Sequence, residues 1–249
     1  PENYDYNLLF VHGLGESGLC FEQFALGLSD RSSNPAPRII IPDLPGYGRS
    51  PRAKTPMSLE EQADLVIAIS RNCEQPTILA GHSMGGVIGQ LIMESAQDLF
   101  AGFINIEGNI SPGDCVFSGQ AAAFSLDEFT KSGFDQLRNN VYENGNTFPA
   151  QRGYYASMRF ADPRQFHLNS GNLLDFSTPE NGAQRFADLT VPKVYIAGQP
   201  RGICNRSVSL LKAQNIQLNI VETSGHWPFI DQEKNTIDHV LTFIKSTLS

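Results

Sequence analysis

Residues 77–86 read Thr77-Ile78-Leu79-Ala80-Gly81-His82-Ser83-Met84-Gly85-Gly86, and this stretch decides the fold. It begins as a short apolar run and turns into a Gly-x-Ser-x-Gly pentapeptide. Apolar residues then recur at the spacing of one helix face, at Val87, Ile88, Leu91 and Ile92. The pattern predicts a buried strand, an abrupt turn and a helix.

Ser83 stands at the apex of that turn, between Gly81 and Gly85. A residue at so tight a turn is strained, and a side chain at either flanking position would collide with the backbone of the turn. The turn would lift the Ser83 hydroxyl above the end of the strand, over the positive end of the helix dipole. We therefore predict that Ser83 is a nucleophile.

The rest of the chain alternates apolar strands with amphipathic helices. Further strands are predicted at 7–11, 38–42, 102–108, 192–198 and 217–222. Helices are predicted at 21–28, at 207–214, at 237–248 and after a capping box formed by Ser58 and Glu61. This alternation predicts an α/β fold, with a mostly parallel twisted sheet and helices on both faces. Ligands bind such sheets beyond the carboxyl ends of the strands, where we expect His12, Asp43, Ser83 and Glu107 to share one edge.

The alternation breaks down between about 111 and 185. This segment has many glycines, prolines and asparagines, no good buried strand and a high content of phenylalanine and tyrosine. We predict that 111–185 forms a mainly helical cap, inserted over a core domain made of 1–110 and 186–249. Each aromatic side chain of the cap, taken alone, is expected to pack in the core of the cap. Taken together, these side chains predict an apolar pocket under a lid.

The composition is that of an ordinary soluble globular chain, with 249 residues of which 41% are hydrophobic and 18% charged. The formal net charge of -8 argues against nucleic acid or an anionic membrane as a partner. No apolar run approaches membrane-spanning length, and the first residues do not resemble a signal peptide. We therefore expect a cytoplasmic protein without membrane insertion.

The four cysteines, Cys20, Cys73, Cys115 and Cys204, lie far apart in the sequence. They form no Cys-x-x-Cys pair and have no histidine at ligand spacing, so structural zinc is not expected. Reduced thiols are the default in a cytoplasmic protein, although the spacing also allows one disulfide. We expect no metal and no cofactor, and the sequence leaves the oligomeric state open.

A serine hydroxyl needs a base to remove its proton, and the base needs an orienting group. His226, in a Gly-His-Trp-Pro loop after the last strand, is our candidate for the base. The alternative is a loop histidine that caps backbone carbonyls. The loop at 199–206, after the penultimate strand, contains no carboxylate.

Glu107 is our candidate for the orienting acid because it ends the strand that follows the serine helix. A carboxylate there lies close to an apolar interior, where it would be costly to leave unpaired. A histidine N–H would supply the partner that Glu107 needs. Glu107 could alternatively form a structural ion pair, or it could cap the first helical turn of the inserted segment.

Two backbone N–H groups should stabilise the charge that develops on a substrate carbonyl oxygen. We expect these donors at Met84, at the start of the helix, and at Leu14, in the His12-Gly13-Leu14-Gly15 turn. His12, Glu16, Ser17 and Trp227 are further candidates for the pocket. Glu16 and Ser17 could instead be solvated, and Trp227 could be a packing residue. Asp43 is interpreted as a turn former that satisfies loop amides.

The chain resembles the α/β-hydrolase superfamily over nearly its whole length. The resemblance rests on His12-Gly13-Leu14-Gly15, on Asp43 to Ser50, on Gly81 to Gly85 and on Gly225-His226. It implies an α/β-hydrolase fold with a cap inserted after the family's sixth strand. Two features depart from the usual pattern. The amino-terminal hairpin is short or missing, and the acid matches the variant that carries it after the sixth strand, at Glu107.

The leading hypothesis is a serine hydrolase that forms an acyl-enzyme on Ser83. The resemblance covers carboxylesterases, lactonases, thioesterases and carbon–carbon bond hydrolases, so it specifies the mechanism better than the substrate. We expect a small, largely apolar acyl substrate with a carboxylester, lactone or thioester bond. The alternatives are a C–C bond hydrolase or a lyase on the same fold, and a ligand receptor derived from a hydrolase. The serine at position 83 excludes the aspartate nucleophile of dehalogenases and epoxide hydrolases.

Overall fold

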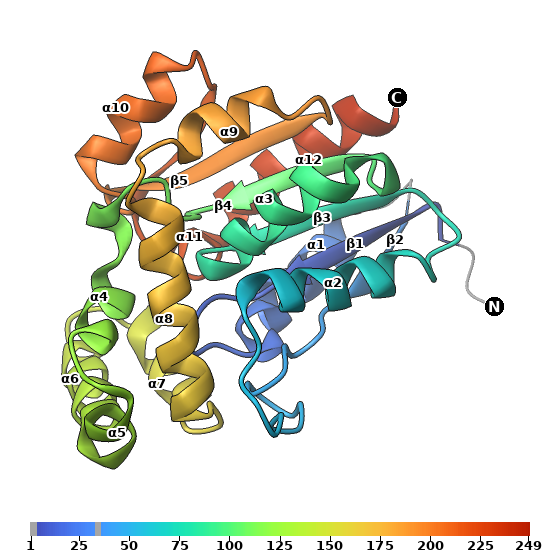
Figure 1. The fold of residues 1–249 in the computed structure, drawn as a ribbon. Coiled ribbons are helices and arrows are strands. Elements are labelled where there is room, and N and C mark those ends of the chain that lie inside the picture. Colours follow the sequence, from blue (N-terminus) through green and yellow to red (C-terminus); the bar gives the residue numbers. More distant parts are fainter. Residues whose placement is uncertain (1–3, 33–35) are drawn as a thin grey trace.

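The computed structural model describes residues 4–32 and 36–249, and a single parallel sheet forms its centre (Figure 1). Its strands are β1 (Tyr6–Val11), β2 (Pro37–Ile40), β3 (Thr77–His82), β4 (Gly102–Ile106), β5 (Lys193–Arg201) and β6 (Leu218–Gly225). The spatial order is β2-β1-β3-β4-β5-β6, and every neighbouring pair is parallel. All six carboxyl ends therefore lie at one edge.

The central strands are covered on both faces. Every residue of β1, β3 and β4 is buried, whereas the edge strand β2 is partly exposed. Helices α2 (Leu59–Ser70) and α3 (Met84–Ala96) pack on one face, and α1 (Glu22–Arg31) and α12 (Glu233–Leu248) cover the other (Figure 1). This double cover explains why the strands read as continuous apolar runs rather than as alternating ones.

The segment between β4 and β5 is helical. It contains α4 (Val116–Ala122), α5 (Leu126–Glu128), α6 (Phe134–Asn144), α7 (Ala150–Met158), α8 (Pro163–Ser177) and α9 (Gly182–Asp188). A π-helical turn, Phe129–Gly133, joins α5 to α6. Helices α4 to α8 lie beyond the edge where the strands end, in green to gold in Figure 1. Helix α9 returns to the sheet, because Phe186 packs against Phe103 of β4 and Tyr195 of β5.

Three short 3₁₀ turns and two further helices complete the described chain. The 3₁₀ turns are Gly18–Phe21, Gln97–Leu99 and Pro112–Asp114, and the helices are α10 (Asn205–Ala213) and α11 (Pro228–Asp231). The predicted capping box at the start of α2 is confirmed: Glu61 N donates to Ser58 Oγ at 3.2 Å, and Ser58 N donates to Glu61 Oε2 at 2.7 Å.

The prediction of a mostly parallel sheet with helices on both faces is confirmed, with differences at the strand ends. β2 and β4 end at Ile40 and Ile106, before the predicted ends at 42 and 108. Strands β5 and β6 are longer than predicted. These strands continue to Arg201 and Gly225, beyond the predicted ends at 198 and 222. The extension pairs Pro200 with Ser224 and Arg201 with Gly225. Among the described residues, no helix combines the length and the apolar character that crossing a bilayer requires. All four cysteines are unpaired.

Candidate active site

The turn after β3 has the strained geometry that its sequence predicts. Ser83 has φ 53° and ψ -117°, a conformation that is costly for a residue with a side chain. Its N–H donates to the Ile106 carbonyl of β4 at 2.9 Å, which holds the turn in place. A Cβ on Gly81 would overlap the carbonyl of Gly85, and a Cβ on Gly85 would overlap the carbonyl of Val11. The second collision is therefore with β1 rather than with the turn itself.

Helix α3 begins directly after Ser83. The N–H groups of Gly86 and Val87 bond the Ser83 carbonyl, at 2.8 and 3.2 Å. The N–H of Met84 is the first of the helix, and such a group has no acceptor within its own helix. Leu14 lies in the turn after β1, where Glu16 N donates to the Gly13 carbonyl at 3.2 Å. Both residues are buried, and, like Ser83, neither is among the residues that line the cavity described below.

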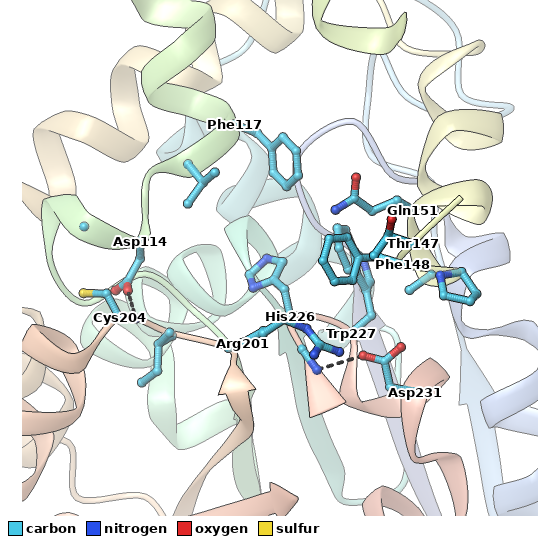
Figure 2. A pocket seen from close by; sticks show the side chains of 17 residues that line it. Asp114, Phe117, Thr147, Phe148, Gln151, Arg201, Cys204, His226, Trp227 and Asp231 are labelled. Atoms are coloured by element: carbon cyan, nitrogen blue, oxygen red, sulfur yellow. Dashed lines mark hydrogen bonds between the residues drawn. The ribbon is translucent and has the colours of Figure 1, made fainter. Parts of the chain in front are cut away.

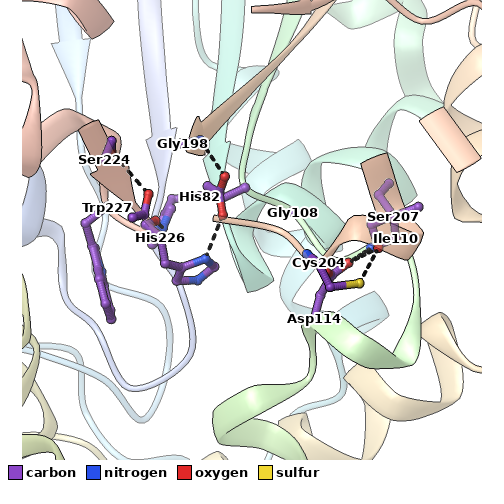
Figure 3. Close-up of polar contacts among 12 residues, drawn as sticks. His82, Gly108, Ile110, Asp114, Gly198, Cys204, Ser207, Ser224, His226 and Trp227 are labelled. Carbon is purple, nitrogen blue, oxygen red and sulfur yellow. Dashed lines mark hydrogen bonds and ion pairs between the residues drawn. The ribbon is translucent and has the colours of Figure 1, made fainter. Parts of the chain in front are cut away.

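Glu107 and His226 form a hydrogen-bonded pair across the sheet edge (Figure 3). His226 Nδ1 lies 3.0 Å from Glu107 Oε2, and Gly198 N donates to Glu107 Oε1 at 2.7 Å. Glu107 is fully buried, whereas the His226 side chain is 25% exposed. Like Ser83, Glu107 has a positive φ, of 58°, which turns the side chain at the end of β4. Gly202 packs so closely on the carboxylate that a Cβ there would overlap it.

The loops of Ser83 and His226 meet through the residue before the serine. The rings of His82 and His226 have centroids 4.8 Å apart, and His82 Nε2 donates to the His226 carbonyl at 2.7 Å. Within the described part of the chain, Ser83 Oγ makes no hydrogen bond, although the residue is partly exposed. Catalytic hydrogen bonds are often long before a substrate binds, so the contact between Ser83 and His226 stays a prediction.

Glu16 and His82 form a buried ion pair that the sequence analysis did not anticipate. His82 Nδ1 lies 2.9 Å from Glu16 Oε2, and Glu16 also accepts from Gly13 N at 2.6 Å and Trp227 Nε1 at 2.5 Å. Burial by itself would raise the pKa of Glu16, but the charge on His82 and these hydrogen bonds lower it to about 2. Burial by itself would lower the pKa of His82, but the Glu16 carboxylate raises it.

The alternative that Glu16 and Ser17 are solvated is wrong, because each is only 2% exposed. His12 is also fully buried, and its Nε2 accepts from Leu44 N at 3.0 Å while its Nδ1 donates to the Gly13 carbonyl at 2.9 Å. Burial lowers the pKa of His12, which fits a neutral ring with these two bonds. His12 and Glu16 thus connect loops, and none of His12, Glu16 and Ser17 lines the cavity described below.

The interpretation of Asp43 as a turn former is confirmed. Its Oδ1 accepts from Gly18 N at 2.6 Å, and its Oδ2 accepts from Arg49 N at 2.7 Å. Burial would raise the pKa of Asp43, but the hydrogen bonds from Arg49 and Gly18 outweigh it, so the pKa is lowered. The carboxylate is therefore committed to backbone amides.

A cavity of about 340 Å³ opens at the carboxyl edge of the sheet, between the predicted cap, 111–185, and the rest of the chain (Figure 2). The predicted core contributes the ends of β5 and β6, and the predicted cap contributes the start of α4 and the α6–α7 connection. The lining residues that the core supplies are Arg201, Gly202, Ile203, Cys204, Gly225, His226, Trp227 and Asp231. Those from the cap are Gly113, Asp114, Val116, Phe117, Thr147, Phe148, Pro149, Ala150 and Gln151.

The His226 ring stands in the middle of this group of side chains in Figure 2, below Phe117. Phe117, Phe148 and Trp227 supply the aromatic part of the wall. Trp227 both packs and lines the cavity, since its ring centroid lies 5.3 Å from that of Tyr154. The expectation of an apolar pocket beneath aromatic cap residues is thus met, while most other aromatic residues of the cap are in its core.

Two acidic side chains of the cavity wall are committed to structural bonds. Asp114 accepts from Cys204 N at 2.8 Å and from Ser207 Oγ at 2.6 Å, and Asp231 accepts from Gly225 N at 2.8 Å. Arg201 lies over the ring of Phe148, 5.0 Å from its centroid. Within the described residues, no cluster of three or more His, Cys, Asp or Glu side chains is arranged to hold a metal ion.

The sequence matches a known family model over most of its length. Residues 8–238 match the model described as "Alpha/beta hydrolase family". The chain belongs to the alpha/beta hydrolase family. Its fold agrees with that membership, since the parallel sheet, the strained serine turn and the histidine loop after β6 are all present. This alpha/beta hydrolase is therefore a hydrolytic enzyme, and the resemblance seen in the sequence is confirmed.

The relatives of this alpha/beta hydrolase include enzymes named for cleaving esters. The chain is 26% identical to the pimeloyl-[acyl-carrier protein] methyl ester esterase of Pectobacterium carotovorum subsp. carotovorum (strain PC1), over 96% of this chain and 94% of the relative. Its structure is similar to an esterase from Exiguobacterium antarcticum, with TM-score 0.79, 18% identity and coverage of 98% and 93% of the two chains.

An enol-lactonase from Burkholderia xenovorans LB400 is similar as well, with TM-score 0.76, 17% identity and coverage of 98% and 92% of the two chains. At such identities the structural likeness shows the fold alone. The nature of the bond that this alpha/beta hydrolase cleaves has to be argued from its own site.

Proposed function

We propose that this alpha/beta hydrolase cleaves an ester-like bond through an acyl-enzyme formed on Ser83. The observation that carries the proposal is the hydrogen bond between His226 Nδ1 and Glu107 Oε2, at 3.0 Å. With its proton held on Nδ1, His226 has an unprotonated Nε2 that can act as a base. The same ring lines the cavity in which a substrate would bind.

The reaction proceeds in two halves. Ser83 Oγ attacks the carbonyl carbon while His226 Nε2 takes its proton, and the Glu107 carboxylate stabilises the imidazolium that forms. The N–H groups of Met84 and Leu14 bind the oxyanion. His226 then gives the proton to the leaving group, and the acyl group stays on Ser83. Water, activated by His226, releases the acid in the second half.

The cavity supports a small, largely apolar acyl substrate. Its volume of about 340 Å³ is at the lower end of the range for ligand pockets. Phe117 and Phe148, from the cap, face the side of the cavity where Trp227 and His226 stand (Figure 2). We also propose that 111–185 acts as the cap of the enzyme, although α9 crosses its predicted end because it packs on the sheet. The carboxylester, lactone and thioester remain the bond types that fit this mechanism.

A fluorophosphonate probe tests the nucleophile directly. It should label the native protein and add one equivalent to the peptide that carries Ser83, while the Ser83→Ala variant should stay unlabelled. Labelling of a folded Ser83→Ala protein would contradict the proposal. A panel of 4-nitrophenyl esters of increasing acyl length, with lactones and thioesters, then identifies the bond. A receptor on this scaffold would bind these compounds without turning them over.

A further inference from the structure

Glu16 bonds one residue beside each of three predicted catalytic groups. It accepts from Gly13 N at 2.6 Å, from His82 Nδ1 at 2.9 Å and from Trp227 Nε1 at 2.5 Å. Gly13 precedes Leu14, His82 precedes Ser83 and Trp227 follows His226. A single buried carboxylate therefore connects the oxyanion turn, the nucleophile turn and the loop of the base.

His82 completes the connection from the other side. Its Nε2 lies 2.7 Å from the carbonyl oxygen of His226, which can only accept a hydrogen bond. Its Nδ1 faces the Glu16 carboxylate, which accepts from Gly13 and Trp227 as well. With acceptors on both sides, each ring nitrogen must carry a proton. His82 in this arrangement is an imidazolium, although it is fully buried.

We propose that Glu16 and His82 form a buried imidazolium–carboxylate pair that positions the catalytic loops of this enzyme. The pair rests on the proposed function, because it aligns the groups named there. Neither residue touches the reacting atoms, so both are positioning residues. Buried pairs contribute little net stability compared with apolar packing, so selection for geometry is the better reason for this one.

The space around the pair is shaped for it. A Cβ on Gly13 would lie 2.8 Å from Glu16 Oε2 and 3.2 Å from His82 Nδ1, so glycine is needed for the close approach. Phe229 packs edge-on against the His82 ring, with centroids 4.9 Å apart. Cys20 Sγ is 3.7 Å from Glu16 Oε2.

Other titratable groups act on the pair from neighbouring elements. Glu107, after β4, raises the pKa of His82, while His12 at the end of β1 faces it as a buried neutral ring. The His226 ring, after β6, is in contact with His82. Since the pKa of His82 is raised by folding, the imidazolium is complete below its ordinary pKa and is lost as the pH rises through the raised value. Deprotonation would remove the donor to the His226 carbonyl or to Glu16.

Nitrogen NMR of the protein labelled with ¹⁵N-histidine counts the protons on His82 without any assay of activity. At pH 7.5, above the ordinary histidine pKa of about 6.5, the His82 ring should show both nitrogens protonated. The signals are assigned by their loss in His82→Gln, with His239→Gln on α12 as the matched control. In Glu16→Gln, His82 should lose its second proton at this pH. A ring with one protonated nitrogen in the native protein would overturn the inference.

Kinetics test the positioning. His82→Gln should lower kcat on the order of 10²-fold with little change in KM, while His239→Gln behaves as the native enzyme. The native kcat should also decline on the alkaline side with the same midpoint as the His82 NMR titration, and His82→Gln should lack that decline. A native kcat that stays flat while NMR shows His82 losing its proton would overturn the positioning role.

The two proposals fail separately. If the fluorophosphonate does not label Ser83 in the native protein, the proposed function is wrong, whereas the proton count on His82 still decides whether the ion pair exists.

Discussion

The substitution Glu107→Gln tests the orientation of the base most sharply, because the structure determines how the amide must sit. Glu107 Oε1 accepts from Gly198 N at 2.7 Å, so the carbonyl oxygen of a glutamine has to take that place. The NH₂ group then faces His226 Nδ1, which lies 3.0 Å from the other oxygen. Since an NH₂ group only donates, Nδ1 becomes an acceptor and the ring proton moves to Nε2. His226 can then no longer take a proton from Ser83.

The same tautomer change costs serine proteases about 10⁴-fold in kcat, which corresponds to about 5 kcal/mol of transition-state stabilisation. We expect a loss of that order, with KM changed little and the fold intact. Initial rates on the best 4-nitrophenyl ester, with circular dichroism and thermal melting of each variant, provide the measurement. Glu94→Gln, on α3 and paired with Arg185 at the surface, is the matched control. A folded Glu107→Gln enzyme within tenfold of the native kcat would refute the reasoning.

Three further outcomes follow from the geometry. Gly85→Ala should destabilise the fold severely, because the added Cβ would overlap the Val11 carbonyl. Gly153→Ala on α7, where an added Cβ would have nothing within 4 Å, should instead raise the free energy of unfolding by about 0.5–1 kcal/mol. Urea denaturation measures both effects. Phe229→Ala should cost about 3–5 kcal/mol, also measured in urea, because the ring is 2% exposed and packs on Phe21. The melting temperature should fall as the pH drops from 4.5 towards the lowered Glu16 pKa of about 2, and this fall should be smaller in Glu16→Gln.

Much of the fold could be predicted because the central strands are buried on both faces. Ile78, Leu79 and Ala80 form an apolar run within β3, every residue of which is buried, and such a run between turn formers is typical of a strand in a doubly covered parallel sheet. The ends of β5 and β6 could not be predicted, because Gln199-Pro200-Arg201 carries no apolar signal. These residues are extended only because the two strands pair with each other.

The candidate site, like the fold, contains some residues that could be predicted from the sequence and others that could not. Glu107 could be proposed from its place at the end of an apolar strand, where a carboxylate needs a partner. The pair of Glu16 and His82 could not, because its partners come from three loops that meet only in the folded chain. The sequence did contain a signal for Glu16. It directly follows the glycine turn after β1, where a charged side chain has little access to solvent and needs a partner. The cavity walls at Phe148 and Arg201 likewise depend on how the cap sits over the core.

The position of the proposed acid has a consequence for how this enzyme can diversify. In the proposed mechanism the acid is Glu107, which directly follows β4, so the loop after β5 carries no part of the proton relay. Residues 201–204 nevertheless form a wall of the cavity. Apart from Gly202, where a Cβ would overlap the Glu107 carboxylate, that loop can change its side chains, and with them the preferred substrate, while the proposed proton relay stays in place. Exchange of the predicted cap is more constrained. A transplanted segment has to begin after Glu107 and preserve the positive φ that orients the Glu107 side chain.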